Sequence, residues 1–209
     1  MKVLLADDHE VVRQGVRQIL IDEFGSAQFG EAVTAAALLR KIREENWDLA
    51  LLDISMPGRS GLDALVEIRK ERPDLPVLVL SIFSEQEYAL RALKAGAAGY
   101  LTKQTLGREL VAAIKKVIAG GRYVTPAQAE LLAEGLGENG IKLPHERLSD
   151  REFEVMKLVA TAKSVKEIAR ELSLGEKTVF TYRARLLEKM GLKNDVEVAR
   201  YALKHRLVD

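Results

Sequence analysis

The 209-residue chain has 47% hydrophobic and 30% charged residues, a composition that excludes disorder as its main state and fits two small globular domains. It has no run of about 18 apolar residues, and Asp7 and Asp8 interrupt the N-terminus before a signal-peptide core could form, so we expect a cytoplasmic protein with no membrane partner. The absence of cysteine excludes disulfides, thiol catalysis and cysteine-based zinc sites. Three histidines, His9, His145 and His205, are too scattered to predict a metal cluster.

The net charge of +1 hides an uneven distribution of charged side chains. Residues 1–122 carry 17 basic and 17 acidic side chains, whereas residues 145–209 carry 14 basic and 11 acidic. Within residues 177–206 there are eight basic and three acidic side chains. A polyanion is a plausible partner for this end of the chain, although a solvated helix face of mixed charge explains the same numbers.

Short apolar runs alternate with stretches of helical periodicity five times in the first 120 residues, which is typical of a parallel sheet. The runs cover residues 3–6, a weak one at 27–30, then 49–52, 77–80 and 99–101. Ser84 followed by Glu87 predicts a capping box at a helix start. Three runs are too apolar to alternate, which indicates strands covered on both faces. We predict a flavodoxin-like, doubly wound, five-stranded parallel α/β domain over residues 1–121.

The pattern changes after Gly121. The dipeptide Thr125-Pro126 opens one short helix, and residues 135–144 are rich in glycine and polar groups, so residues 122–144 are predicted to be a linker with a short helix. No strand signal follows. We predict that residues 145–209 form a second, all-α domain.

The helix start and stop signals of this second domain predict four helices. They are expected at about 149–161, 164–172 and 176–190, with a last helix capped by Asn194. Ser149 with Glu152 and Ser164 with Glu167 are capping boxes. The second and third helices are short and joined by a tight turn containing Gly175, which is the signature of a helix-turn-helix.

The informative polar residues follow the predicted strands: Asp7 and Asp8, then Asp53, Ser81 and Lys103. In an open α/β sheet, working groups collect at the carboxyl ends of the strands. Three carboxylates from adjacent strands repel one another unless a cation lies among them, and hard oxygen ligands favour Mg²⁺. With the lysine ammonium and the serine hydroxyl, they outline a pocket for phosphoryl transfer onto a carboxylate.

Each of these residues also has a simpler structural explanation. Asp8 could cap the first helix, Asp53 could start a turn, and Lys103 could be solvated. These explanations account for each residue separately. They do not account for the placement of all these residues at the ends of four strands, which is hard to obtain by chance.

The segments that carry these residues resemble bacterial two-component receiver domains of the CheY-like type. The matching segments are 5–9 (Leu-Ala-Asp-Asp-His), 52–58 (Leu-Asp-Ile-Ser-Met-Pro-Gly), Ser81, and 95–103 (Ala-Gly-Ala-Ala-Gly-Tyr-Leu-Thr-Lys). The resemblance implies that Asp53 accepts a phosphoryl group from the histidine of a sensor kinase. It also implies that Mg²⁺ is bound by the carboxylates of Asp7, Asp8 and Asp53 and by the carbonyl of Ser55.

The resemblance further implies that Ser81 and Lys103 bind the acyl phosphate and that Tyr100 turns inward on activation. Phosphorylation would add charge and acceptor oxygens that draw Ser81 toward them, leaving space for the tyrosine. The chain departs from the common receiver pattern at two positions. Ile82 occupies a place where many receivers have a small residue, which could slow phosphotransfer, and Gln104 replaces a frequent proline, which could alter the start of the last receiver helix.

The helix predicted at 176–190 has one buried and one exposed face. With Val179 at the centre of the inner face, Leu186 and Met190 fall in the core. Phe180 lies on the flank of the helix, and its large apolar side chain is hard to explain if the position only faces solvent. A helix that enters the major groove carries such a mixture of basic, threonine, apolar and small residues, but packing of Phe180 on the receiver domain is the alternative.

The segments at 148–152, 166–169, 176–179 and 189–192 resemble the LuxR-type helix-turn-helix, and the whole chain resembles response regulators of the NarL/FixJ family. The resemblance implies that Phe180, Thr181 and Ala184 face bases, whereas Lys177, Thr178 and Arg185 lie nearer phosphates. Because the base-facing set lacks strong bidentate readers, sequence preference could depend on methyl contacts and DNA shape. The last helix resembles the family's dimerisation helix, or simply packs in the core; its apolar residues are Val196, Val198, Ala199, Ala202 and Leu203.

The sequence therefore predicts a two-component response regulator rather than an enzyme. Its expected partners are a sensor histidine kinase, double-stranded DNA, RNA polymerase and, when phosphorylated, a second copy of the chain. One alternative is a phosphorylation-independent DNA-binding regulator with an inert receiver. The other alternative is an aspartyl-phosphate phosphatase. Ser55 counts against it, because enzymes resembling the haloacid dehalogenase group have a second aspartate at this position.

Overall fold

The computed structural model describes residues 1–83, 85–137, 143–205 and 207–208. The chain forms two compact units, Met1–Gly137 and Glu138–Asp209. The domain limits expected from the sequence, at residues 121 and 145, stay a prediction.

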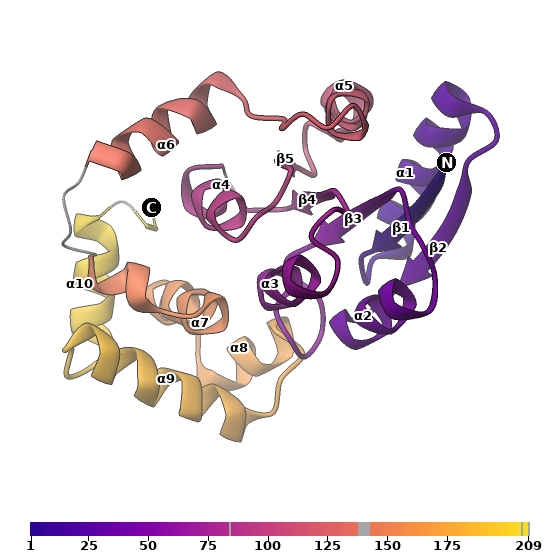
Figure 1. The fold of residues 1–209 in the computed structure, drawn as a ribbon. Helices are drawn as coiled ribbons and strands as arrows, with labels where there is room; N and C mark the ends of the chain where they lie inside the picture. The colour runs from indigo at the N-terminus through magenta and orange to yellow at the C-terminus, as the bar shows by residue number, and fades with distance from the viewer. Residues whose placement is uncertain (84, 138–142, 206, 209) are drawn as a thin grey trace. The chain divides into compact units, whose positions relative to one another are not determined.

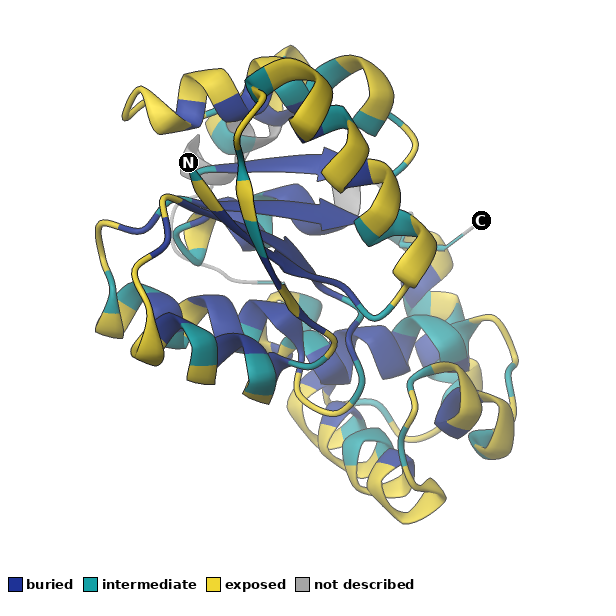
Figure 2. Ribbon diagram, turned by 90° about the vertical axis from the view of Figure 1, so that its right-hand side faces the viewer, coloured by how far each residue is buried: buried dark blue, intermediate teal, exposed yellow. Residues whose placement is uncertain are grey.

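The first unit contains a five-stranded parallel sheet with the strand order β2-β1-β3-β4-β5. The strands are β1 (Lys2–Ala6), β2 (Gln28–Ala32), β3 (Leu49–Asp53), β4 (Val77–Ser81) and β5 (Gly99–Thr102). Every residue of β3 and β4 is buried, as Figure 2 shows for the centre of the sheet. This confirms the flavodoxin-like doubly wound fold, and strands covered on both faces explain why these runs do not alternate.

Helices cover both faces of the sheet (Figure 1). They are α1 (Glu10–Phe24), α2 (Ala35–Glu44), α3 (Gly61–Glu71), α4 (Glu85–Lys94) and α5 (Leu106–Ile118). One face packs against α1 and α5, whose buried residues include Val16, Leu20, Leu110 and Ile114. On the other face lie α2, α3 and α4. The predicted capping box of Ser84 with Glu87 lies outside the described residues.

A further helix, α6 (Pro126–Gly137), begins at the predicted Thr125-Pro126 start and belongs to the first unit. It packs against α4. Just before it, Tyr123 forms a parallel bridge with Gly99, and its N–H donates to the Ala98 carbonyl over 2.8 Å. The chain after α5 therefore covers the outer edge of β5 and continues into a helix that stays on the receiver.

The second unit contains the four predicted helices, preceded by a 3-10 turn, η1 (Pro144–Arg147). The helices are α7 (Asp150–Ala160), α8 (Val165–Glu171), α9 (Glu176–Met190) and α10 (Asp195–Lys204). Both predicted capping boxes form, and Asn194 caps α10 by accepting the Glu197 N–H. Gly191, in the left-handed region with φ 67°, ends α9. The core includes Phe153, Val155, Ile168, Val179, Leu186 and Val198.

No helix in the described part of the chain is long and apolar enough to cross a membrane.

The start of α3 lies directly against the end of β3. The Gly61 N–H donates to the Ile54 carbonyl over 3.0 Å, and Ser60, fully buried, caps the helix by accepting the Leu62 N–H. A Cβ added at Gly61 would lie 2.2 Å from the Asp53 carbonyl oxygen. Only glycine allows this approach, which fixes the loop after Asp53.

We expect Gly61→Ala to destabilise the first unit by about 1–3 kcal/mol, because the extra carbon must displace backbone rather than a flexible side chain. Urea unfolding followed by the fluorescence of Trp47 measures this, since the chain's single tryptophan is buried in this unit. Gly107→Ala is the matched control, because a Cβ at position 107 would meet nothing within 4 Å. This substitution should stabilise α5 by about 0.5–1 kcal/mol. Equal stabilities of the Gly61→Ala variant and the wild type would contradict the close approach.

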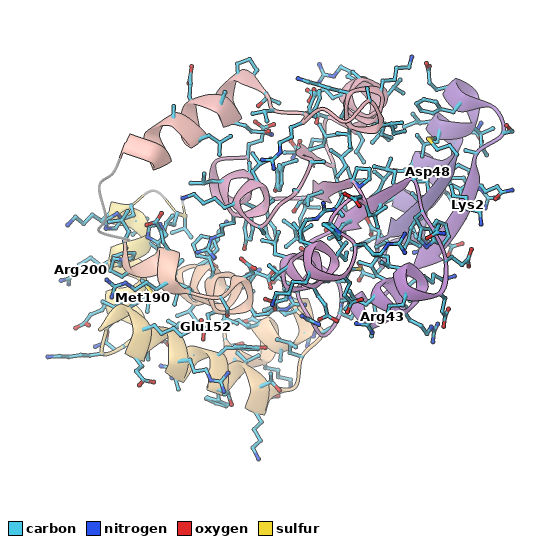
Figure 3. The ribbon with its side chains drawn as sticks, viewed as in Figure 1. Lys2, Arg43, Asp48, Glu152, Met190 and Arg200 are labelled. Carbon is cyan, nitrogen blue, oxygen red and sulfur yellow. The ribbon has the colours of Figure 1, made fainter. Side chains whose placement is uncertain are left out.

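In the second unit, Glu152 ties α7 to α9 and lies between these helices (Figure 3). Its Oε2 accepts from Lys189 Nζ over 2.6 Å and from the Ser149 N–H over 2.8 Å. Burial alone would raise the pKa of Glu152, but the hydrogen bonds from Lys189 and Ser149 outweigh it and hold the pKa below the ordinary value of 4.5. Because the folded-state pKa is the lower one, this stabilisation is complete above about pH 4.5 and is lost as the pH falls through the folded-state pKa.

We therefore expect Glu152→Gln to destabilise the second unit by about 1–2 kcal/mol at pH 7, and to reduce the loss of stability below pH 4.5. Urea unfolding read by hydrogen exchange of residues 150–160 measures both effects. Glu176→Gln, which changes an exposed carboxylate in the first turn of α9, is the control. If wild type and Glu152→Gln showed the same dependence on pH, the Glu152 pair would not be the origin of the acid sensitivity.

Candidate functional site

The polar residues predicted at the strand ends gather at the carboxyl edge of the sheet. Asp7 and Asp8 follow β1, and Asp53 is the last residue of β3, which is the neighbour of β1 in the sheet. Ligand atoms of these three aspartates and of His9 all lie within 4.8 Å of one another. Because parallel strands end at the same edge, chain positions more than 40 residues apart form one cluster.

Lys103, which follows β5, enters this cluster from the other side of the sheet centre. Its Nζ lies 2.6 Å from Asp7 Oδ2 and 2.7 Å from Asp53 Oδ2. The side chain of Lys103 is 10% exposed and that of Asp53 is 1% exposed. One ammonium group thus bridges two buried carboxylates, and it offsets a repulsion that water does not screen at this depth.

The charges at this site shift one another's ionisation. Burial raises the pKa of Asp53, and the negative charge of Asp7 adds to the rise, while the ammonium of Lys103 opposes it. Burial alone would lower the pKa of Lys103, but attraction by Asp53 and Asp7 outweighs burial and raises it. Lys103 is therefore held in its charged form, and its charge opposes the rise that burial causes in the pKa of Asp53.

The site can also accept a cation. Asp53 Oδ1 accepts from the Ser55 N–H over 3.0 Å, which orients the carboxylate. Asp7 Oδ2 and Asp8 Oδ1 are buried, and each lies close to one nitrogen, Lys103 Nζ at 2.6 Å and His9 Nδ1 at 2.9 Å, which leaves lone pairs for a further ligand. Buried carboxylate oxygens with unused lone pairs are the hard donors that Mg²⁺ prefers, so the residues present fit this ion.

Ser81 and Tyr100 lie on β4 and β5, beside this edge. The Ser81 hydroxyl, fully buried, accepts from the Phe83 N–H over 3.1 Å. The ring of Tyr100 is also fully buried, and its hydroxyl donates to the Phe83 carbonyl over 2.9 Å. The structure therefore contains the inward position of Tyr100, and its predicted movement between two positions stays a prediction.

The sequence reasoning missed three features. His9 was treated as an isolated histidine, yet it lies among the aspartates; its only sequence signal is its place directly after Asp7-Asp8. His145 and His205 are not scattered either, because their ring centroids are 5.8 Å apart. Gln128, on α6, was not singled out, although its side chain donates to the backbone carbonyl of Tyr100 on β5. Both positions noted as departures from receivers, Ile82 and Gln104, are exposed.

Helix α9 has the two faces that its periodicity predicted. Val179, Leu186 and Met190 are buried. All six residues expected to face nucleic acid are exposed: Lys177, Thr178, Phe180, Thr181, Ala184 and Arg185. Phe180 is 54% exposed, an unusual position for a large apolar side chain.

The structure separates the basic residues of this end into two groups. Arg183 pairs with Asp195 over 2.7 Å, and Lys189 pairs with Glu152, so these cations hold α9 against α10 and α7. Lys177 and Arg185 have no ion pair within the described part of the chain. Lys177 and Arg185 therefore leave two charges, unpaired among the described residues, on the exposed face of α9, which also carries Phe180.

The predicted dimerisation residues on α10 do not share one environment. Val196 and Leu203 are 68% and 56% exposed, and Ala199 is half-buried. Ala202 is fully buried, in a helix that packs against α7. The assignment of Val196, Ala199, Ala202 and Leu203 to dimerisation stays a prediction, and Val196 and Leu203 are the most exposed of the four.

Comparison with known proteins covers both units. Residues 3–115 match the response regulator receiver domain, and residues 146–202 match the luxR family of bacterial regulatory proteins. The chain is 38% identical over 210 residues to the response regulator GacA of Pseudomonas aeruginosa, covering 100% of this chain and 98% of the relative. It is 36% identical over 208 residues to the response regulator UvrY of Escherichia coli, covering 99% and 95%.

Solved structures agree with these matches. RcsB of Salmonella enterica serovar Typhimurium, bound to the promoter rprA in the presence of phosphomimetic beryllofluoride, has a TM-score of 0.62 and 27% identity, covering 96% of this chain and 98% of that one. A LuxR-family response regulator from an Aurantimonas species has a TM-score of 0.58 and 35% identity, covering 66% and 98%. The chain belongs to the NarL/FixJ family of two-component response regulators, in which a receiver domain is joined to a LuxR-type helix-turn-helix domain.

Proposed function

We propose that a sensor histidine kinase phosphorylates Asp53 and that this modification switches dimerisation and sequence-specific DNA binding to regulate transcription in the cytoplasm. The observation that carries the proposal is the bridge of Lys103 between the buried carboxylates of Asp7 and Asp53. A phosphoryl group on Asp53 would be met by a fixed ammonium group, which is the arrangement that stabilises charge developing on phosphoryl oxygens.

The chemical step is a transfer onto a carboxylate. One Asp53 oxygen attacks the phosphorus of a phosphohistidine and an O–P bond forms. The P–N bond breaks, its electron pair returns to the imidazole, and the imidazole takes up a proton. The Ser55 N–H holds Asp53 Oδ1, so the carboxylate is oriented before the donor arrives.

We propose that Mg²⁺ would be held by the carboxylates of Asp7, Asp8 and Asp53 and by the carbonyl of Ser55. When bound, the ion supplies positive charge that neutralises phosphoryl oxygens during transfer. The unused lone pairs of Asp7 Oδ2 and Asp8 Oδ1 support this assignment.

The response of the protein would begin at Ser81. A phosphoryl oxygen would be a strong acceptor for the Ser81 O–H, so the serine side chain would move toward the phosphoryl group and change its bond from the Phe83 N–H. The carbonyl of Phe83 also accepts from the Tyr100 hydroxyl. A shift of Phe83 would therefore alter both the loop after β4 and the hydrogen bond that holds the Tyr100 hydroxyl.

DNA binding is assigned to the exposed face of α9. Phe180, Thr181 and Ala184 would face base edges and thymine methyl groups, while Lys177, Thr178 and Arg185 would contact phosphates. The solved complex of RcsB with promoter DNA supports this assignment.

A homodimer through α10 would use Val196, Ala199 and Leu203. The dimer would place its two copies of α9 on DNA half-sites about 10 bp apart. RNA polymerase would be recruited or excluded next to these half-sites. The exposure of Val196 and Leu203 supports this surface.

No turnover is proposed for the receiver. A phosphatase that used Asp53 as nucleophile would need an acid/base group to release the product, and Ser55, two residues later, has an unionised hydroxyl.

We expect incubation with acetyl phosphate and Mg²⁺ to give one alkali-labile phosphate per wild-type chain, and none in Asp53→Asn, because the amide is not a nucleophile toward phosphorus. Radiolabel retention after gel filtration measures this. Chelation of Mg²⁺ should lower the labelling of the wild type, and Asp63→Asn, which alters a carboxylate on α3 outside the cluster, should label normally. Stable labelling of Asp53→Asn would place the phosphoacceptor elsewhere.

We expect Arg185→Ala to weaken DNA binding by roughly the same factor on all sequences and to lower the slope of log affinity against log salt by about 1, because it removes one phosphate contact. Titration at three salt concentrations with specific and random DNA measures both. Arg200→Ala, an exposed arginine on α10, is the control and should change neither. A loss confined to the specific DNA would show that Arg185 reads bases instead.

A further inference from the structure

Gln128, in the first turn of α6, is a fully buried amide on the receiver. Glutamine is among the residues seldom found at zero exposure, because its four hydrogen-bonding positions must be satisfied inside the protein. The buried contacts of Gln128 therefore indicate what its amide does.

One side of the amide completes a helix cap. The Thr125 N–H donates to Gln128 Oε1 over 3.3 Å, and the Gln128 N–H donates to Thr125 Oγ1 over 3.2 Å. This reciprocal pair is the capping box, and glutamate would serve equally well at the second position. Capping alone thus gives no reason for an amide rather than a carboxylate.

The other side of the amide, its Nε2 group, is bonded to strand β5. Gln128 Nε2 donates to the backbone carbonyl of Tyr100 over 2.9 Å, and this bond is buried. A carboxylate could not make it, since it has no proton to donate. The choice of glutamine is therefore explained by β5 and not by the helix start.

The same turn of α6 is also attached to α4. Thr125 Oγ1 donates to Glu85 Oε2 over 2.9 Å, at the first residue of α4. The segment before it is held along β5 by the pairing of Tyr123 with Ala98 and Gly99. The start of α6 is thus bonded to β5, which carries Tyr100, and to α4, which follows the Phe83 loop.

A continuous series of contacts leads from the proposed phosphorylation site to α6. Ser81 bonds to the N–H of Phe83, the carbonyl of Phe83 bonds to the Tyr100 hydroxyl, and the carbonyl of Tyr100 bonds to Gln128. We propose that Gln128 is a positioning residue that couples the position of β5 at Tyr100 to the docking of α6, the helix that precedes the DNA-binding unit in the chain. This inference rests on the proposed function, because it takes phosphorylation of Asp53 as the event that moves Tyr100.

Coupling of this kind is reciprocal. If the state of the phosphorylation site alters the bond between Tyr100 and Gln128, loss of that bond must alter the response to phosphorylation. The stimulation of DNA binding by a phosphomimetic should therefore fall roughly five- to tenfold, which corresponds to a coupling of about 1–1.4 kcal/mol.

The test uses the full-length chain with Mg²⁺, with and without beryllofluoride. Gln128→Met removes the bond to Tyr100 and one bond of the cap at nearly the same side-chain volume. Thr125→Val is the stricter control, because it removes one bond of the cap and also the bond to Glu85 of α4, but leaves the amide of Gln128 free to reach Tyr100. Gln128→Glu is a second variant, which keeps the cap acceptor, lacks the donor and places a carboxyl group at a buried position. Urea unfolding confirms that each variant is folded.

Two readouts are taken on the same samples: hydrogen exchange of residues 124–133 and affinity for a selected DNA site. In the wild type and in Thr125→Val, beryllofluoride should change the exchange of this segment and tighten DNA binding. In Gln128→Met and Gln128→Glu, exchange should become faster and indifferent to beryllofluoride, and the stimulation should fall by the factor given above. A loss of phosphomimetic dependence, rather than of stability, is the mark of coupling.

The outcomes separate the two proposals. If beryllofluoride tightens DNA binding equally in Gln128→Met and the wild type, or if Thr125→Val loses as much stimulation as Gln128→Met, the coupling through Gln128 is overturned while the phosphorylation switch stands. If beryllofluoride changes the exchange of α6 through Gln128 but leaves DNA binding unchanged in the wild type, the coupling stands and the proposed regulation of DNA binding fails.

Discussion

The ammonium group of Lys103, held between the carboxylates of Asp7 and Asp53, is the interaction on which the receiver depends. It offsets the repulsion of buried like charges, and it raises the availability of Asp53 as an ionised nucleophile in a place where burial works against ionisation. The strand order makes this possible, because β1 and β3 are neighbours and β5 ends at the same edge of the sheet. The close approach of Gly61 to the carbonyl of Asp53 then fixes the loop that completes the site.

A single bond cannot drive the switch. Shifting a two-state equilibrium from 1:99 to 99:1 requires about 5.5 kcal/mol, whereas one buried hydrogen bond contributes about 0.5–1.5 kcal/mol. The charge of an acyl phosphate close to Lys103 is the larger source of energy. The contacts through Phe83, Tyr100 and Gln128 distribute its effect to β5 and α6. In the second unit, by contrast, the ion pairs of Arg183 and Lys189 join α9 to α10 and α7.

The sequence predicts those features that depend on periodicity and on local chemistry. The five apolar runs became the five strands, the serine capping boxes at 149 and 164 formed, and Val179, Leu186 and Met190 are the inner face of α9. Features that depend on which element packs against which were not predictable. Periodicity places Ala202 on an apolar face of α10 but cannot say that α7 covers it, and nothing local shows that the amide of Gln128 meets a carbonyl 28 residues earlier. His9 was missed because its neighbours come from two strands.

The most direct test of the account is the affinity of the full chain for a selected DNA site, with Mg²⁺ and with or without beryllofluoride, in wild type and Asp53→Asn. The account predicts tighter binding and dimer formation only in the wild type with beryllofluoride, because only there does Lys103 face an occupied phosphoryl position. Equally tight binding in all four samples would contradict it, and would leave a helix-turn-helix protein whose receiver does not control DNA binding.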